Sequence, residues 1–170
     1  MCSQILQTTH LNCSLTEQQI SDYSDVIRQL HNKLETTNDL TGWLHYPEED
    51  HDDVLLQVEQ VAAEIRQEAD VLIVVGVGGS FLGARAILDA LTPYFGCQMQ
   101  GIEVIYVGQN MSGAYINQLL KYIVDKRVYV NVISKSGGTM EPALAFRAMR
   151  QYMEAKYGED AQRRIIVTTD

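Results

Sequence analysis

A six-residue stretch at positions 134–139 carries three hydroxyl groups, one lysine and two glycines. Hydroxyl and ammonium groups donate hydrogen bonds to anionic oxygens, and the lysine adds a full positive charge. Neighbouring glycines let backbone N–H groups curl around one centre, which is the geometry of an anion-binding loop. The stretch therefore predicts a phosphate site made from Ser134, Lys135, Ser136, Gly137, Gly138 and Thr139.

The flanking sequence predicts that this loop joins a strand to a helix. An apolar, largely β-branched run occupies residues 128–133, and an amphipathic run follows at 143–157. The amino end of a helix carries partial positive charge and unpaired N–H groups, so it reinforces a phosphate site. Pro142 suits the first turn of that helix, where a missing N–H costs nothing. Glu141 either caps the helix or contacts the ligand, and the sequence leaves both roles open.

A second glycine-rich stretch, Gly76-Val77-Gly78-Gly79-Ser80, follows the apolar run at 71–75. A dinucleotide fingerprint would need glycine at position 81, which is Phe81, and a nucleotide-phosphate loop would need lysine at position 84, which is Ala84. Both motifs fail, so we expect neither NAD nor ATP. Backbone donors and the Ser80 hydroxyl could instead face sugar hydroxyls, with a simple tight turn as the alternative.

From residue 70 onward, apolar runs of strand length alternate with helical patterns. The expected strands are 71–75, 102–107, 128–133 and 165–169, and the expected helices are 81–91, 112–123 and 142 onward. This alternation predicts an α/β fold: a three-layer αβα sandwich with an open parallel sheet, of the Rossmann-like or flavodoxin-like type. In such sheets ligands bind at the carboxyl ends of the strands, where both glycine-bearing loops and residues 108–110 fall.

Two amphipathic helices are expected before the sheet. Residues 1–13 are polar and unpatterned, and Ser14 with Glu17 predicts a capping box for a helix over 15–34. Its apolar stripe consists of Ile20, Tyr23, Ile27, Leu30 and Leu34. A second helix is expected from residue 54 to about 69, which gives an N-terminal region at 1–69 and an α/β domain at 70–170. The chain stops after its last strand with no helix to cover the sheet, so we expect a piece of a longer protein.

Composition and charge narrow the functional classes. The 170 residues are 46% hydrophobic and carry a net charge of −9, which disfavours nucleic acid as a partner because binding there depends on basic surfaces. No apolar stretch is long enough to span a membrane, and the amino terminus lacks the pattern of a signal peptide, so we expect a cytoplasmic protein. Three cysteines without metal-ligand spacing fit a reducing compartment.

The acidic run at 48–53, with His45 nearby, is the candidate metal cluster of the sequence. Carboxylates at the start of a helix stabilise its dipole while they remain solvated, which accounts for the run without a ligand. We therefore expect no metal.

The two loops together resemble the sugar-isomerase domain, or SIS domain, of the phosphoglucose isomerase family. The resemblance runs from about residue 40 to the end of the chain. Its motifs are Thr41–Leu44, Gly76–Ser80 with Leu82-Gly83, Gln109-Asn110, Asn131–Gly137, Thr139–Pro142 and Thr168–Asp170. The lysine in loop 134–139 distinguishes this family from other sugar-isomerase domains, which usually lack it.

The resemblance implies an isomerase of glycolysis and gluconeogenesis that interconverts glucose 6-phosphate and fructose 6-phosphate without a metal or organic cofactor. It implies that the hydroxyls and lysine of loop 134–139 grip the phosphate, that Gly79 and Ser80 contact the sugar, and that Glu141 borders the site. The family usually has threonine where Gly138 stands, so we expect one hydroxyl fewer in the phosphate loop.

The resemblance also implies which groups this chain lacks. The glutamate base, the ring-opening histidine, a further lysine and an arginine of the family lie beyond residue 170. We therefore expect no catalytic residue in this chain, which would hold the phosphate-binding half of the site and be inactive alone. For the full-length protein the resemblance implies a homodimer that binds sugar phosphate, with neither nucleic acid nor membrane as a partner.

Two other functions remain open. One is a non-catalytic sugar-phosphate sensor that uses the same domain beside a basic, DNA-binding helix-turn-helix. The helix expected at 15–34 has only Arg28 and Lys33 as basic residues, which argues against a sensor. The other is a different aldose–ketose isomerase for phosphosugars, which Lys135 argues against.

Overall fold

The computed structural model describes residues 16–36, 41–93 and 101–169. The chain divides into two compact units, Met1–Asp52 and Asp53–Asp170. Almost all of helix α3 (Asp52–Glu68) belongs to the second unit, whereas the sequence pattern places that helix in an N-terminal region. α3 groups with the sheet because its buried residue Ile65 packs against Tyr129 of a central strand.

The described part of the first unit begins with two helices, α1 (Glu17–Asp22) and α2 (Ser24–Thr36). Thr16 caps α1: its hydroxyl accepts from the Gln19 N–H at 3.2 Å, and the Gln19 side chain accepts from the Thr16 N–H at 2.8 Å. A capping box thus forms at Thr16, and the box predicted at Ser14 involves a residue that lies outside the described residues.

One residue, Tyr23, separates α1 from α2, where the sequence predicts a single helix over 15–34. The Ser24 hydroxyl donates to the Ile20 carbonyl at 3.4 Å. This side-chain bond competes with the regular backbone ladder, which explains the interruption. Two 3₁₀ turns follow later in the unit, at Gly42–Leu44 and Tyr46–Glu48.

The segment around the acidic run is held by a ring contact and by backbone groups. His51 stacks on Tyr46 with ring centroids 4.0 Å apart, and its Nε2 lies 2.7 Å from the Tyr46 carbonyl oxygen. The Asp50 carboxylate accepts from the Asp52 N–H at 3.0 Å, at the start of α3. This position agrees with the prediction that carboxylates of the run stabilise a helix start.

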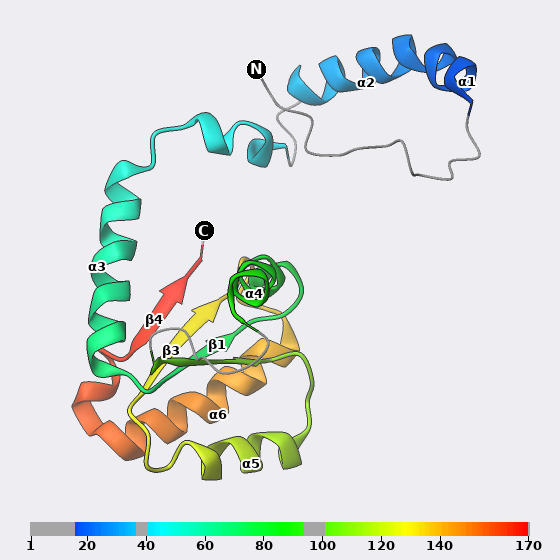
Figure 1. The fold of residues 1–170 in the computed structure, drawn as a ribbon. Helices are drawn as coiled ribbons and strands as arrows, with labels where there is room; N and C mark the ends of the chain where they lie inside the picture. The colour runs from blue at the N-terminus through cyan, green and yellow to red at the C-terminus, as the bar shows by residue number, and fades with distance from the viewer. Residues whose placement is uncertain (1–15, 37–40, 94–100, 170) are drawn as a thin grey trace. The chain divides into compact units, whose positions relative to one another are not determined.

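The second unit is built on a four-stranded sheet whose strands are all parallel, in the order β2-β1-β3-β4. The strands are β1 (Val71–Val75), β2 (Glu103–Val107), β3 (Val128–Ile133) and β4 (Ile165–Thr168). Their carboxyl ends are aligned, since Val75 pairs with Val107 on one side and with Val132 on the other. The predicted open parallel sheet is confirmed (Figure 1).

Helices cover both faces of this sheet, which confirms the predicted three-layer sandwich (Figure 1). Besides α3 they are α4 (Gly79–Leu91), α5 (Gly113–Tyr122) and α6 (Met140–Tyr157). Within the described residues, no helix combines the length and the apolar character that crossing a membrane requires.

The main core fills the face that α5 and α6 cover. Its buried members come from alternate positions of the strands and from both helices, and they include Val71, Ile73, Val75, Val128, Val130, Leu119, Ile123, Met149 and Met153. Continuous apolar strands of this kind are expected where both faces of a parallel sheet are covered. On the opposite face, Tyr129 packs against Ile65 of α3, and the Phe81 ring of α4 lies 5.2 Å from the Tyr106 ring of β2.

Candidate functional site

The order of the strands brings the two glycine-bearing loops together at the carboxyl end of the sheet. β1 lies between β2 and β3, so loop 76–80 neighbours loop 134–139 on one side and residues 108–110 on the other. After β1 the chain enters α4 on one face of the sheet, and after β3 it enters α6 on the other face. Ligands of open α/β sheets bind where neighbouring strands lead to opposite faces. The two predicted loops flank such a point.

Loop 134–139 is held in shape by its own serines. The Ser134 hydroxyl accepts from the Gly137 N–H at 3.0 Å, and the Ser136 hydroxyl accepts from the Gly138 N–H at 3.3 Å. Gly137 has φ +67°, a left-handed conformation that glycine adopts without strain. Because each serine accepts a bond from the loop, its own O–H proton stays available for a ligand oxygen.

The start of this loop is anchored on β4 by a link that no sequence pattern predicts. The Ser134 N–H donates to the Thr168 carbonyl at 3.1 Å. The Thr168 hydroxyl in turn donates to the Asn131 side-chain oxygen at 3.1 Å, across 37 positions of sequence. The one available signal is that Asn131 stands out as the polar residue of an otherwise apolar strand.

The lysine and the threonine of the loop are exposed. Thr139 is the N-cap residue of α6, yet its hydroxyl makes no capping bond within the described structure. An N-cap hydroxyl ordinarily bonds to an N–H of the first turn, so here those donors remain open to a ligand. Lys135 is exposed beside them in sequence. The loop thus presents hydroxyl, ammonium and helix N–H donors, which suits an anion.

The loop after β1 presents a second helix start to the same end of the sheet. α4 begins at Gly79, two residues before the predicted start at Phe81, and Gly78 is its N-cap. Gly79 is exposed and Ser80 is half-buried in the first turn. The Ser80 N–H donates to the Val77 carbonyl at 3.2 Å. The hydroxyl is therefore the donor that Ser80 offers to a ligand.

Glu141 lies in the first turn of α6 and is half-buried. A carboxylate in this position interacts favourably with the helix dipole, so Glu141 stabilises the helix start whether or not a ligand is bound. Its neighbour Pro142, also in the first turn as predicted, is buried and provides no N–H donor.

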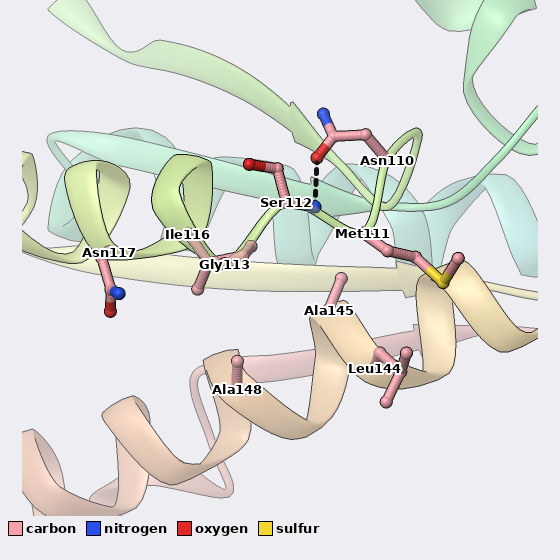
Figure 2. Close-up of a pocket in the computed structure, with 9 residues that line it drawn as sticks. All are labelled: Asn110, Met111, Ser112, Gly113, Ile116, Asn117, Leu144, Ala145 and Ala148. Carbon is pink, nitrogen blue, oxygen red and sulfur yellow. Dashed lines mark hydrogen bonds between the residues drawn. The ribbon is translucent and has the colours of Figure 1, made fainter.

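A cavity of about 240 Å³ lies next to this end of the sheet, between the start of α5 and α6 (Figure 2). It is lined by Asn110, Met111, Ser112, Gly113, Ile116, Asn117, Leu144, Ala145 and Ala148. The Asn110 side-chain oxygen accepts from the Ser112 N–H at 3.0 Å, as the dashed line in Figure 2 shows. None of the predicted site residues, all of which the structure describes, lines this cavity.

The turn after β2 is fixed by two side chains that meet on one carbonyl. The Gln109 amide donates to the Tyr106 carbonyl at 3.1 Å, and the Tyr115 hydroxyl donates to the same oxygen at 3.2 Å. The Tyr106 hydroxyl is buried and has no hydrogen-bond partner among the described residues. Burial raises the pKa of Tyr106 above its usual range, and the nearby Asp89 carboxylate adds to this effect. The tyrosine therefore stays neutral and contributes as an apolar ring against Phe81.

Solved structures place the chain in the class of three-layer α/β proteins with an open parallel sheet. A crystal structure of hypothetical protein TT0462 from Thermus thermophilus matches 90% of this chain and 35% of its own, with a TM-score of 0.75 and 24% identity. A glucose-6-phosphate isomerase from Chlamydia trachomatis matches 68% of this chain and 21% of its own, with a TM-score of 0.55 and 27% identity.

Sequence comparison gives the family. The profile described as phosphoglucose isomerase matches residues 57–170. The glucose-6-phosphate isomerase of Shouchella clausii is 46% identical over 149 residues, which is 84% of this chain. The chain belongs to the phosphoglucose isomerase family, and it spans about a third of the length of the curated relatives it matches.

Proposed function

We propose that this chain forms the phosphate-binding part of the active site of a glucose-6-phosphate isomerase. The observation that carries the proposal is the loop 134–139, whose hydroxyls, lysine and helix N–H donors gather at the carboxyl end of the sheet. Membership of the phosphoglucose isomerase family supports a sugar phosphate as the ligand.

Each part of the loop has a role in this proposal. The O–H groups of Ser134, Ser136 and Thr139 donate to phosphate oxygens, and Lys135 supplies the positive charge that an acidic chain must place locally. The N–H groups of Gly137 and Gly138 are bonded to the serine hydroxyls, so these glycines shape the loop. Position 138 contributes no hydroxyl, because glycine stands there.

In this proposal, loop 76–80 binds the sugar end of the ligand. Gly79 and Ser80 offer a backbone N–H and a hydroxyl to the hydroxyl groups of the sugar, and Glu141 borders the ligand from the start of α6. A phosphorylated monosaccharide, with an anion at one end and neutral hydroxyls along its length, fits this division between the loops.

The reaction moves a proton between two adjacent carbons through an enediol, and it needs a base beside those carbons. The phosphate is carried on a carbon remote from them, so loop 134–139 holds and orients the substrate without touching the reacting atoms. We place the base and the ring-opening groups in the rest of the full-length protein. The chain matches only about a third of the length of its relatives, so about two thirds of their length lies outside it.

The test is calorimetric titration of the chain with fructose 6-phosphate at low salt. Lys135→Ala should weaken binding by about tenfold or more, because it removes a charge-assisted bond. Lys121→Ala is the matched control, since Lys121 is an exposed lysine in the last turn of α5, at the far end of that helix from the loops. Equal affinities in the unmodified chain and Lys135→Ala would place the ligand elsewhere.

An isomerase assay tests the division of labour separately. The isolated chain should give no turnover of glucose 6-phosphate even where it binds fructose 6-phosphate. Turnover at the rate of an ordinary enzyme would show that the base lies within these residues.

A further inference from the structure

Three backbone segments meet in close contact beneath the two loops. A methyl group at Gly108, just after β2, would lie 3.0 Å from the Gly76 carbonyl oxygen, 3.3 Å from the Gly76 nitrogen and 3.3 Å from the Pro142 Cα. All three residues are buried, and Gly108 has φ +104°, which favours glycine. The contacts are with backbone atoms, which cannot rotate away as a flexible side chain can.

Gly76 also packs against the segment that leads into loop 134–139. A methyl group there would lie 3.1 Å from the Ser80 Cβ and 3.4 Å from the Ile133 carbonyl oxygen. The Gly76 N–H also donates to the Val107 carbonyl at 2.9 Å, directly before Gly108. Gly76 therefore lies against Ser80, which bears the hydroxyl of loop 76–80, and against Ile133, which directly precedes loop 134–139. Gly108 lies against Gly76 and against Pro142 in the first turn of α6.

We propose that Gly76 and Gly108 are positioning residues that set the distance between the two loops, and thereby fit the site to a phosphorylated monosaccharide that bridges them. The inference rests on the proposed function. Because neither residue has a Cβ, the backbones approach closely enough for one small ligand to reach Ser80 and loop 134–139 together. A side chain at either position would push the loops apart by a few tenths of an ångström.

The spacing matters differently for two ligands. Inorganic phosphate contacts loop 134–139 alone, so its affinity does not depend on where the first loop lies. Fructose 6-phosphate contacts both loops, so a change in their separation costs it hydrogen bonds at one end. A pure loss of stability would affect the two ligands alike in the folded protein.

The experiment compares Gly76→Ala and Gly108→Ala in the full 170-residue chain, each titrated with inorganic phosphate and with fructose 6-phosphate. Gly101→Ala is the matched control: Gly101 also has a positive φ, +83°, but a methyl group there meets nothing within 4 Å among the described residues. Gly76 does not have a positive φ, so Gly76→Ala adds no backbone strain of that kind. This variant still tests the proposal if Gly108→Ala does not fold. Thermal unfolding of each variant reports stability.

We expect Gly76→Ala and Gly108→Ala to weaken fructose 6-phosphate binding about tenfold, which corresponds to the loss of one or two hydrogen bonds, and to change phosphate affinity less than about twofold. Gly101→Ala should change neither affinity. An equal effect on both ligands, or no effect of Gly76→Ala on fructose 6-phosphate, overturns the spacing role alone. Failure of the unmodified chain to bind fructose 6-phosphate overturns the proposed function, and this inference with it.

Discussion

The two ends of the parallel sheet are held by different kinds of interaction. At the amino end, side chains bond one another across long stretches of sequence: Arg127 donates to Asp70, and the Tyr129 hydroxyl shares its one proton between the carboxylates of Glu64 and Glu68. At the carboxyl end, one backbone bond from Ser134 anchors the predicted phosphate loop to β4, and the rest of the loop is closed by short-range bonds between its own serines and glycines. The long-range bonds fix the framework, and the short-range ones shape a loop whose donors stay open to a ligand.

Tyr129 is the centre of the amino-end network. Its hydroxyl lies 2.8 Å from a carboxylate oxygen of Glu64 and 2.8 Å from one of Glu68, and Arg163 bonds the same Glu68 oxygen at 2.6 Å. The hydrogen bond from Tyr129 lowers the pKa of Glu68, with a further contribution from Arg163. Burial and the two carboxylates raise the pKa of Tyr129. This network joins α3 to β3 and to the residues that lead into β4.

The largest expected effect on stability comes from breaking that network. Tyr129→Ala should lower the free energy of unfolding by about 3–5 kcal/mol, because it removes a ring that is 1% exposed. Tyr129→Phe keeps the ring and removes the hydroxyl, and it should cost about 1–2 kcal/mol. Urea unfolding measures both. Equal losses in the two variants would mean that the hydroxyl, and not packing of the ring, holds this end of the sheet.

A smaller effect is expected at Asp70, and it depends on pH. The Asp70 carboxylate accepts from the Arg127 side chain at 2.7 Å and from the Arg127 N–H at 2.8 Å, and these bonds lower its pKa to about 2. Since the folded pKa lies below the unfolded value, the carboxylate stabilises the fold above about pH 4 and loses this contribution as pH falls toward about 2.

Asp70→Asn removes the titrating group and keeps the shape of the side chain. At pH 5 it should be about 1 kcal/mol less stable than the unmodified chain, a value reduced from the full shift because the Asp70 side chain is 42% exposed. Unfolding measured at a series of pH values should show this difference shrink as the pH falls from about 4 toward about 2. A difference that stays constant over this range would remove the ion pair as its cause.

The sheet and the place of its loops follow from local sequence. The apolar runs at 71–75 and 128–133 identify strands because a parallel sheet covered on both faces requires apolar residues on both sides. Parallel strands then carry the loops after β1 and β3 to one end. The composition of loop 134–139 is itself local, so its residues could be named before the fold was known.

Contacts between distant residues leave no such pattern. Tyr129 meets Glu64 across 65 positions, and Gly108 meets Gly76 only once β1 and β2 have paired. The sequence pattern also does not predict the break at Tyr23, because the apolar periodicity continues through this residue. The Ser24 hydroxyl competes there with the regular backbone hydrogen bonds of the helix. The periodicity predicts helical segments, and single side-chain bonds decide where they stop.

The smallest effect on stability, and the sharpest contrast between the two ends, is expected at Ser134. Its hydroxyl accepts from the Gly137 N–H at 3.0 Å in an exposed loop, so Ser134→Ala should lower the free energy of unfolding by no more than about 0.5 kcal/mol while weakening phosphate binding severalfold. Ser112→Ala is the control, because that serine caps α5 and should cost about 1 kcal/mol with phosphate affinity unchanged. Chemical unfolding and calorimetry on the same preparations give both quantities. If Ser134→Ala behaves like the Ser112 variant, the loop serine serves the fold and not the binding of an anion.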